Sequence, residues 1–251
     1  MNKETKWLLQ EKYHGVETSE FCVDVTQLTA GLPLAYAIGW VSFLGCHIDL
    51  SLHPFIPRPE TEFWVKQAIE EIVNRQSPVA GKKNQMKILD LFSGSGCVGI
   101  ALAKHLSGAR VDFGEKDRRF CKQIGKNLML NNIDASRVRI IKTDVFSHIA
   151  DSYDFIFANP PYIDPTKKDT VQDSVLAYEP HESLFASDGG LQFIKKLLAE
   201  EGAHLKQKGA MYIEFGNGQK EAIAQFARTL GRKNEFQKDQ FGEWRIVKIT
   251  T

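Results

Sequence analysis

The chain has 251 residues, of which 43% are hydrophobic, so it can bury a full core as one large domain or as a domain with a small appendage. Its 32 basic and 31 acidic residues leave a formal charge of +1, which argues against a broad basic surface that binds nucleic acid regardless of sequence. The four cysteines form no C-x-x-C pair and the seven histidines lack metal-ligand spacing, so we expect neither a disulfide framework nor a metal site. No apolar run reaches transmembrane length and no secretory signal is visible, so we expect a cytoplasmic, monomeric protein without membrane contact.

The pattern of the first part of the chain predicts short helices and a hairpin, which are too small to form a core of their own. Residues 1 to about 35 carry helical patterns, and residues 40–52 alternate like a β-hairpin around a Gly-Cys turn. Three prolines within residues 54–59 then force an extended path. Acidic residues open the next helix, which we expect to run to about Asn74.

A polar linker over residues 76–85 predicts the boundary between two parts of the chain. Residues 1–83 are expected to form a small N-terminal region of helices, a hairpin and a proline-rich lip. Residues 84–251 are expected to form a larger α/β domain.

In this larger domain, short apolar runs alternate with helical patterns, which predicts βαβ units and a mostly parallel sheet. The expected strands cover residues 86–91, 110–115, 138–142, 153–158 and 210–215. The expected helices cover residues 97–106, 118–130, 191–206 and 219–230. Two last apolar runs, 235–238 and 244–249, flank Phe241-Gly242 and predict a closing antiparallel hairpin. A parallel sheet that ends in an antiparallel strand resembles the sheet of the class I methyltransferases, whereas the last strands of a dinucleotide-binding dehydrogenase normally also run parallel.

A glycine-rich turn follows the first of these strands and leads directly into a helix. Gly94, Gly96 and Gly99 match G-x-G-x-x-G, and Glu115 ends the second strand, where an acid can bind a ribose diol. The pattern alone does not separate NAD from S-adenosylmethionine, because both carry an adenosine. No Gly-Lys-Ser/Thr follows, which excludes a lysine-bearing P-loop. The predicted cofactor contacts here are Asp90, Phe92, Ser93, Gly94, Ser95, Gly96 and Glu115.

Asp144 and Val145 lie just past the third strand and add a second predicted contact. The Asp144 carboxylate can accept a hydrogen bond from an adenine amine. Acids after the second and third strands together suit an adenosyl group spread along the carboxyl edge of the sheet, where such folds bind ligands.

The tetrapeptide Asn159-Pro160-Pro161-Tyr162 directly follows the fourth strand. The Asn159 side-chain oxygen and the Pro160 carbonyl can accept both N–H groups of a flat NH2 group, and Pro161 has no N–H to compete for them. Tyr162 adds an aromatic face. The target can be a glutamine amide or the exocyclic amine of a base. Since Asn159 lies on the same edge as the glycine turn, it is also a predicted cofactor contact, and the arrangement favours methyl transfer.

The residues quoted above, together with others along the chain, resemble the release factor glutamine methyltransferases, also called the HemK or PrmC family. The discriminating segment is Arg58-Pro59-Glu60-Thr61-Glu62, because the related ribosomal-protein glutamine methyltransferases typically differ after the equivalent Pro-Arg. Further matching segments are Pro33 to Tyr36 with Gly39, Glu179-Pro180, Ala186 to Leu191, Glu214 to Gln219, and Lys238-Asp239 with Arg245.

The resemblance implies a Rossmann-like class I methyltransferase fold, with a mostly parallel seven-stranded sheet that ends in an antiparallel hairpin. It implies S-adenosylmethionine as cofactor, S-adenosylhomocysteine as product, and a class 1 peptide chain release factor as partner. The methyl group would go to the N5 amide nitrogen of the glutamine in a Gly-Gly-Gln motif. Catalytic roles fall on Asn159, Pro160 and Tyr162, and the substrate contacts on Asn159, Pro160, Pro161, Tyr162, Arg58 and Glu60.

Two departures from the family pattern are visible. The family often begins its loop with glycine where this chain has Phe92. The helical region that helps the family grip the release factor is reduced to little more than thirty residues before Pro33.

Three other readings remain open at this point. An N-methyltransferase acting on an adenine or guanine amine of DNA or RNA would also use the tetrapeptide, but it needs a basic channel, for which only Lys167-Lys168 and Arg232-Lys233 offer small patches. An NAD-dependent oxidoreductase leaves the tetrapeptide unexplained and lacks a Tyr-x-x-x-Lys set. A non-catalytic binding module on the same fold is disfavoured by intact Asn159 and Glu115.

Overall fold

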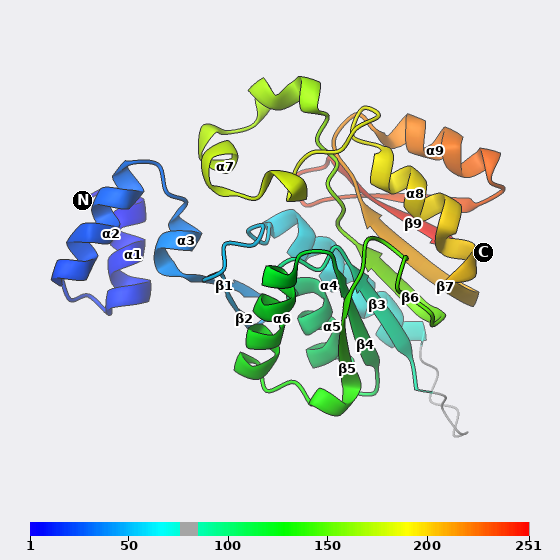
Figure 1. Cartoon of the computed structure of the whole chain (residues 1–251), viewed down its shortest axis with the longest axis horizontal. Helices are drawn as coiled ribbons and strands as arrows, with labels where there is room; N and C mark the ends of the chain where they lie inside the picture. The colour runs from blue at the N-terminus through cyan, green and yellow to red at the C-terminus, as the bar shows by residue number, and fades with distance from the viewer. Residues whose placement is uncertain (76–84, 251) are drawn as a thin grey trace.

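The computed structural model describes residues 1–75 and 85–250 (Figure 1). The predicted linker over 76–85 lies, except for Gln85, outside the described residues, so the division at 83/84 stays a prediction. A central seven-stranded sheet carries helices on both faces, and three helices at the N-terminus stand at the opposite end of the molecule from the last strands.

The sheet has the order β5-β4-β3-β6-β7-β9-β8. Its strands are β3 (Lys87–Leu91), β4 (Arg110–Glu115), β5 (Val138–Lys142), β6 (Tyr153–Ala158), β7 (Leu205–Glu214), β8 (Lys233–Lys238) and β9 (Trp244–Thr250). Strands β3 to β7 pair in parallel, and β9 runs antiparallel to both β7 and β8. The predicted parallel sheet with a closing hairpin is therefore confirmed. The order reverses between β3 and β6, and the carboxyl ends of these two strands flank the topological switch point where such sheets bind ligands.

Helices cover the two faces of the sheet. One face packs against α4 (Pro59–Arg75), α5 (Cys97–His105) and α6 (Arg118–Leu130), and the other against α8 (Gln192–Glu200) and α9 (Lys220–Thr229) (Figure 1). Successive strand residues point to opposite faces, so Ile88 lies in the first core and Leu89 in the second. Helix α4 contributes Trp64 and Val65 to the first core, which means that this core is shared between the N-terminal region and the sheet.

The boundary between α8 and β7 differs from the prediction of one helix over 191–206. Helix α8 ends at Glu200, a short 3-10 helix η4 (Glu201–Ala203) follows, and β7 begins at Leu205. The apolar spacing continues the helical period from Leu198 to Leu205, but Leu205 instead pairs with Tyr153 at the start of β6. The predicted helix end was wrong because strand pairing outweighed the local pattern.

The N-terminal region contains α1 (Lys3–Tyr13), α2 (Ser19–Thr29) and α3 (Leu34–Ile38), which share a small core, followed by the hairpin strands β1 (Trp40–Phe43) and β2 (Cys46–Asp49). The hairpin was predicted, and its turn residues Leu44 and Gly45 both have positive φ. It docks on α6 through side-chain amides, since the backbone N–H of Asp49 donates to Asn127 Oδ1 at 2.9 Å.

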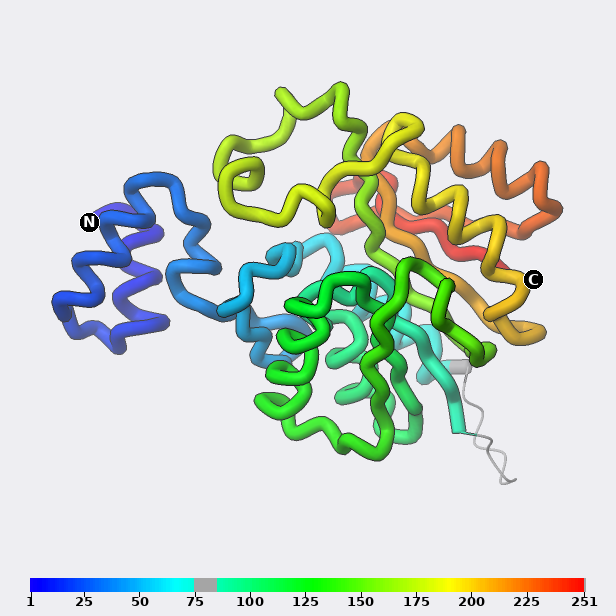
Figure 2. The backbone as a smooth tube through the Cα atoms, viewed as in Figure 1, coloured from blue at the N-terminus to red at the C-terminus, as the bar shows by residue number. Residues whose placement is uncertain are grey.

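The segment after β6 forms three short helices, η2 (Pro165–Thr170), α7 (Asp173–Tyr178) and η3 (His181–Ser183), and it arches above the proline-rich lip toward the N-terminal helices (Figures 1 and 2). Glu179 ties this segment to the lip. Its carboxylate accepts from the Ile56 N–H at 3.1 Å and from Arg58 Nη2 at 2.5 Å. At the other end, the Tyr178 hydroxyl donates to the Ala30 carbonyl at 3.4 Å.

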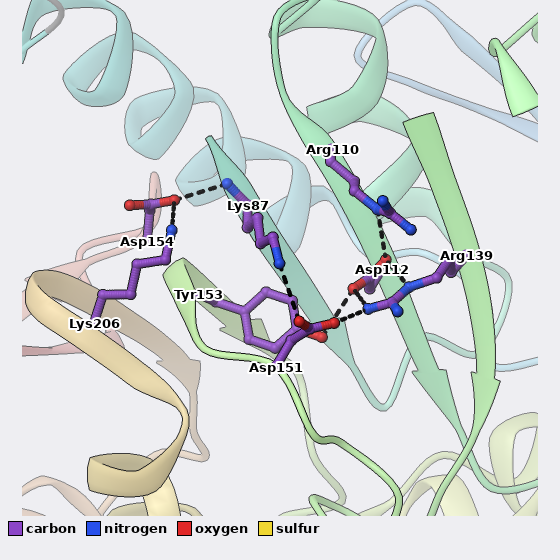
Figure 3. A network of polar contacts seen from close by, with 8 residues as sticks. All are labelled: Lys87, Arg110, Asp112, Arg139, Asp151, Tyr153, Asp154 and Lys206. Atoms are coloured by element: carbon purple, nitrogen blue, oxygen red, sulfur yellow. Dashed lines mark hydrogen bonds and ion pairs between the residues drawn. The ribbon is translucent and has the colours of Figure 1, made fainter. Parts of the chain in front are cut away.

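A network of charged residues links the amino ends of the strands (Figure 3). Its centre is Asp112, which is 1% exposed and accepts from Arg139 Nε at 2.9 Å and from the Tyr153 hydroxyl at 2.9 Å. Lys87 Nζ donates to Asp151 at 3.0 Å, and Asp151 also pairs with Arg139. These contacts join β3, β4, β5 and β6 at the edge of the sheet opposite the carboxyl ends of the strands.

Candidate active site

A cleft of about 1040 Å³ opens at the carboxyl edge of the sheet, where β3, β4, β5, β6 and β7 end. Its walls come from the glycine turn, the proline-rich lip, the segment after β6 and the turn between β8 and β9. The cleft is large enough for a ligand the size of a nucleoside together with a second group. The predicted site residues that line it are Arg58, Glu60, Asp90, Phe92, Ser93, Gly94, Ser95, Glu115, Asp144, Val145, Asn159, Pro160, Pro161 and Tyr162.

Gly96 is the predicted residue that lies behind the wall of the cleft. It is the N-cap of α5, with φ 81°, and an added Cβ would lie 3.2 Å from the Ile124 side chain. Gly99 serves close packing of helix on strand, because a Cβ there would lie 2.3 Å from the Phe113 ring. Gly94, with φ 52°, is the member of the motif that faces the cleft. Of the three glycines of the motif, Gly94 thus lines the cleft, whereas Gly96 and Gly99 allow close packing.

Glu115 ends β4 and turns its carboxylate back toward the glycine turn. Oε2 accepts the Gly94 N–H at 2.8 Å, and Oε1 accepts the Asp117 N–H at 2.8 Å. Burial raises the pKa of Glu115, while these backbone hydrogen bonds act in the opposite direction. A carboxylate has about four acceptor positions, so both oxygens keep lone pairs for hydroxyl donors of a ligand.

Asp90 is a buried residue next to the carboxyl end of β3, and it accepts the Gly99 N–H on Oδ2 at 2.9 Å. Burial raises the pKa of Asp90 to about 8. At neutral pH the group therefore mainly holds its proton, and it can donate as well as accept a hydrogen bond.

Two residues in the wall of the cleft adopt backbone conformations that favour glycine. Phe92 has φ 57° and the β-branched Val145 has φ 56°. Each such conformation costs on the order of 1–3 kcal/mol, and such strain gathers at ligand sites. The Phe92 ring packs edge-on against Phe193 with centroids 5.4 Å apart. The position where the resemblance led us to expect glycine thus keeps a glycine-like backbone while it places a ring at the cleft.

Asp144 is the most exposed of the predicted cofactor acids. Its side chain is 48% exposed, and Oδ2 lies 2.9 Å from Lys116 Nζ. Arg58 is likewise already paired, since it binds Glu179 and lies over the Phe55 ring at 4.5 Å. Both groups line the cleft while they hold neighbouring segments of the chain together.

The tetrapeptide after β6 forms the floor of the cleft near the switch point. Asn159 Nδ2 lies 3.4 Å from Thr61 Oγ1, and the Tyr162 hydroxyl donates to Glu214 Oε1 at 3.2 Å. The Tyr162 carbonyl accepts from Gln219 Nε2 at 2.9 Å, and this hydrogen bond holds the backbone of the tetrapeptide in place. Pro160 and Pro161 are buried.

Two residues beside the tetrapeptide, Thr61 and Glu214, lie in segments that carry the family resemblance, but the sequence analysis gave them no role in the site. Thr61 and Glu214 are buried, and Glu214 Oε2 accepts from Thr61 Oγ1 at 2.7 Å and from Trp64 Nε1 at 2.8 Å. Burial raises the pKa of Glu214, and the hydrogen bonds from Trp64 and Thr61 act in the opposite direction. Glu214 ends the strand β7, so the signal that pointed to Glu115, an acid at the end of a strand, was available for it too.

Within residues 1–75 and 85–250, no group of three or more His, Cys, Asp or Glu residues is arranged to hold a metal ion. In the same described ranges, no helix is both long and apolar enough to cross a membrane.

Residues 78–241 match the family of the methyltransferase small domain. The chain is 32% identical to the release factor glutamine methyltransferase of Streptococcus pneumoniae, over 96% of this chain and 83% of the relative. The chain belongs to the release factor glutamine methyltransferase family. The enzyme of the same name from Flavobacterium psychrophilum is 29% identical over 95% of this chain and 82% of its own, and that of Lactococcus lactis is 30% identical over 96% and 86%. The family that the sequence motifs resemble is thereby confirmed.

Solved structures support the fold. The human Mettl16 catalytic domain in complex with the MAT2A 3'UTR hairpin 6 has a TM-score of 0.62 at 18% identity, over 82% of this chain and 76% of that one. The ribosomal protein L11 methylase of Lactobacillus delbrueckii has a TM-score of 0.55 at 17% identity, over 78% and 80%. At this identity the likeness concerns the fold, and it confirms the Rossmann-like class I methyltransferase architecture of this family member.

Proposed function

We propose that this methyltransferase transfers a methyl group from S-adenosylmethionine to the N5 amide nitrogen of the glutamine in a Gly-Gly-Gln motif of a class 1 peptide chain release factor. The observation that carries the proposal is the position of Asn159 and Pro160 in the floor of the cleft, on the same edge of the sheet as Glu115 and the glycine turn. The family names of the relatives support the release factor as partner. The proposal includes action as a monomer in the cytoplasm.

The residues of the cleft fit S-adenosylmethionine. Glu115 has lone pairs left for the ribose hydroxyls after its two backbone hydrogen bonds. A Cβ on Gly94 would meet only the Phe92 carbonyl, at 3.9 Å, so the turn leaves its backbone open to a ligand. Two acids line the same cleft: the buried Asp90 is available to the amino group of the ligand, and the exposed Asp144 is available to the edge of its adenine. When bound, S-adenosylmethionine supplies an electrophilic methyl group on its sulfonium and leaves as S-adenosylhomocysteine.

The tetrapeptide aligns the acceptor nitrogen. An amide nitrogen is a poor nucleophile because its lone pair is delocalised into the carbonyl group, so orientation is the main contribution that a protein can make. The Asn159 Oδ1 and the Pro160 carbonyl accept the two N–H groups of the glutamine amide, and Tyr162 packs against its plane. As positive charge develops on nitrogen, the two oxygens stabilise it in a site with little water. Arg58 and Glu60 lie at the rim, where they contact the polypeptide around the glutamine.

Transfer of labelled methyl from S-adenosylmethionine to a purified class 1 release factor tests the proposal. The matched control is the same factor with the glutamine of its Gly-Gly-Gln motif changed to alanine. Label in the first factor alone is the expected result. Label in both places the acceptor elsewhere, and label in neither, with binding of S-adenosylmethionine intact, overturns the proposal in favour of a nucleic-acid amine, which an arm with bulk tRNA and DNA then tests.

A further inference from the structure

A chain of hydrogen bonds runs from the buried Glu214 to the amide that is proposed to bind the substrate. Glu214 Oε2 accepts from Thr61 Oγ1 at 2.7 Å, and Thr61 Oγ1 lies 3.4 Å from Asn159 Nδ2. Both Glu214 and Thr61 are almost fully buried, at 1% and 2% exposure, so water does not compete for these bonds. The two residues lie far apart in sequence and meet because α4 packs across the carboxyl end of β7.

The Thr61 hydroxyl determines which atoms donate and which accept in this series of hydrogen bonds. A threonine hydroxyl has one hydrogen, and Thr61 donates it to Glu214 Oε2, an oxygen that faces hydrogen-bond donors from two residues. Trp64 Nε1, which can only donate, occupies a second acceptor position on the same oxygen at 2.8 Å. The Thr61 oxygen is then left with lone pairs alone, so it can face only a donor.

Because the Thr61 oxygen can face only a donor, the orientation of the Asn159 amide is also determined. The Asn159 side chain must turn Nδ2, its donor, toward Thr61, and its acceptor Oδ1 then points the other way, into the cleft that it lines. The opposite orientation would place two acceptors, Oδ1 and the Thr61 oxygen, against each other and present an NH2 group to a substrate NH2. Only one of the two amide orientations therefore suits an acceptor of amine hydrogens.

We infer that Thr61 and Glu214 are positioning residues that fix the orientation of the Asn159 amide, so that Oδ1 faces the substrate nitrogen. Glu214 also accepts the Tyr162 hydroxyl, so one buried carboxylate holds two members of the tetrapeptide. The inference rests on the proposed function for the identity of the substrate, but the orientation of Asn159 does not depend on it.

The matched pair Thr61→Val and Thr61→Ser tests the inference. Valine keeps the shape and removes the hydroxyl, whereas serine keeps the hydroxyl. We expect Thr61→Val to lower kcat about ten-fold, the factor that corresponds to ~1.4 kcal/mol, while Thr61→Ser restores most of the rate. The Kd for S-adenosylhomocysteine should stay within two-fold of wild type in both variants. Glu214→Gln should lie between them, because its amide oxygen can still accept from Thr61 and Trp64.

A second readout separates this inference from the proposed function. In the ¹⁵N NMR spectrum, the side-chain amide of Asn159 should exchange slowly with water in wild type and Thr61→Ser, and faster in Thr61→Val. An inactive wild type on every release factor overturns the proposed function and leaves this readout valid. Equal exchange in all three proteins, or equal loss of kcat in Thr61→Val and Thr61→Ser, overturns the positioning role.

Discussion

The substitution Glu115→Gln should weaken binding of S-adenosylmethionine. Each Glu115 oxygen accepts one backbone N–H, from Gly94 and from Asp117, at 2.8 Å. Glutamine keeps one of these acceptors and turns an NH2 group against the other N–H. Glutamine is also uncharged, so the variant loses the charge-assisted hydrogen bond that Glu115 is proposed to accept from the ribose. Such a bond is worth about 1.5–3 kcal/mol, which corresponds to roughly a 10- to 150-fold rise in Kd.

Titration calorimetry with S-adenosylhomocysteine measures this effect, and Asp144→Asn is the matched control. Asp144 is half-exposed, so water screens its charge, and asparagine keeps one side-chain oxygen as an acceptor; we therefore expect a rise in Kd of at most roughly five-fold, or about 1 kcal/mol. Circular dichroism and urea unfolding report whether Glu115→Gln still folds. A Kd within three-fold of wild type in a folded Glu115→Gln protein, or an equal loss in Asp144→Asn, would refute the role given to Glu115.

Three further predictions concern rate, pH and stability. Asn159→Ala should lower kcat at least 100-fold in the labelled-methyl assay, with the Kd for S-adenosylhomocysteine changed less than five-fold, because it removes an acceptor that orients the substrate. Burial raises the pKa of Asp90 to about 8, so Asp90 contributes stability that is present below pH 4 and is lost as the pH rises toward 8; Asp90→Asn should therefore gain stability relative to wild type across that range in urea unfolding. Asp112→Asn should lower the free energy of unfolding by about 1.5–3 kcal/mol, because Arg139 and Tyr153 lose a buried acceptor, while methyl transfer stays at the wild-type rate.

Each of these has a result that contradicts it. A proportional loss of rate and cofactor affinity in Asn159→Ala would move Asn159 from substrate orientation to cofactor binding. A stability difference for Asp90→Asn that is flat or falls between pH 4 and pH 8 would contradict the raised pKa. Loss of less than 0.5 kcal/mol in Asp112→Asn, or a larger loss in the more exposed Asp151→Asn, would contradict the central place of Asp112 in its network.

The sheet and most of the cleft could be predicted because their signals are local. Buried parallel strands read as continuous apolar runs, and the first residues after them converge on one edge whatever the details of packing. The positions of Glu115 and Asn159 at this edge were predicted in this way, and both line the cleft. The positive φ of Phe92 was foreshadowed by the glycine that the family often has at this position.

The parts that were missed depend on contacts between distant segments. Thr61 belongs to the segment that discriminates the family, but the sequence gives it no partner, and only the packing of α4 against β7 brings it to Glu214. Leu205 continues the apolar period of a helix, but pairing with Tyr153 draws it into a strand. Gly96 matches a ligand motif by spacing, but it lies behind the wall of the cleft, against Ile124. In each case the partner, rather than the local sequence, decides the outcome.

The shared core of α4 and the sheet has a practical consequence for dissecting this enzyme. Trp64 stacks on Phe157 of β6 with ring centroids 6.0 Å apart, and Thr61 on the same helix completes the floor of the cleft. The chain up to residue 75 therefore supplies part of both the core and the cleft to residues 85–250. Expressed separately, the two fragments should each be poorly folded. Co-expressed, they should reassemble into an active heterodimer, and fragment complementation would then allow each half to be varied in combinatorial pairs.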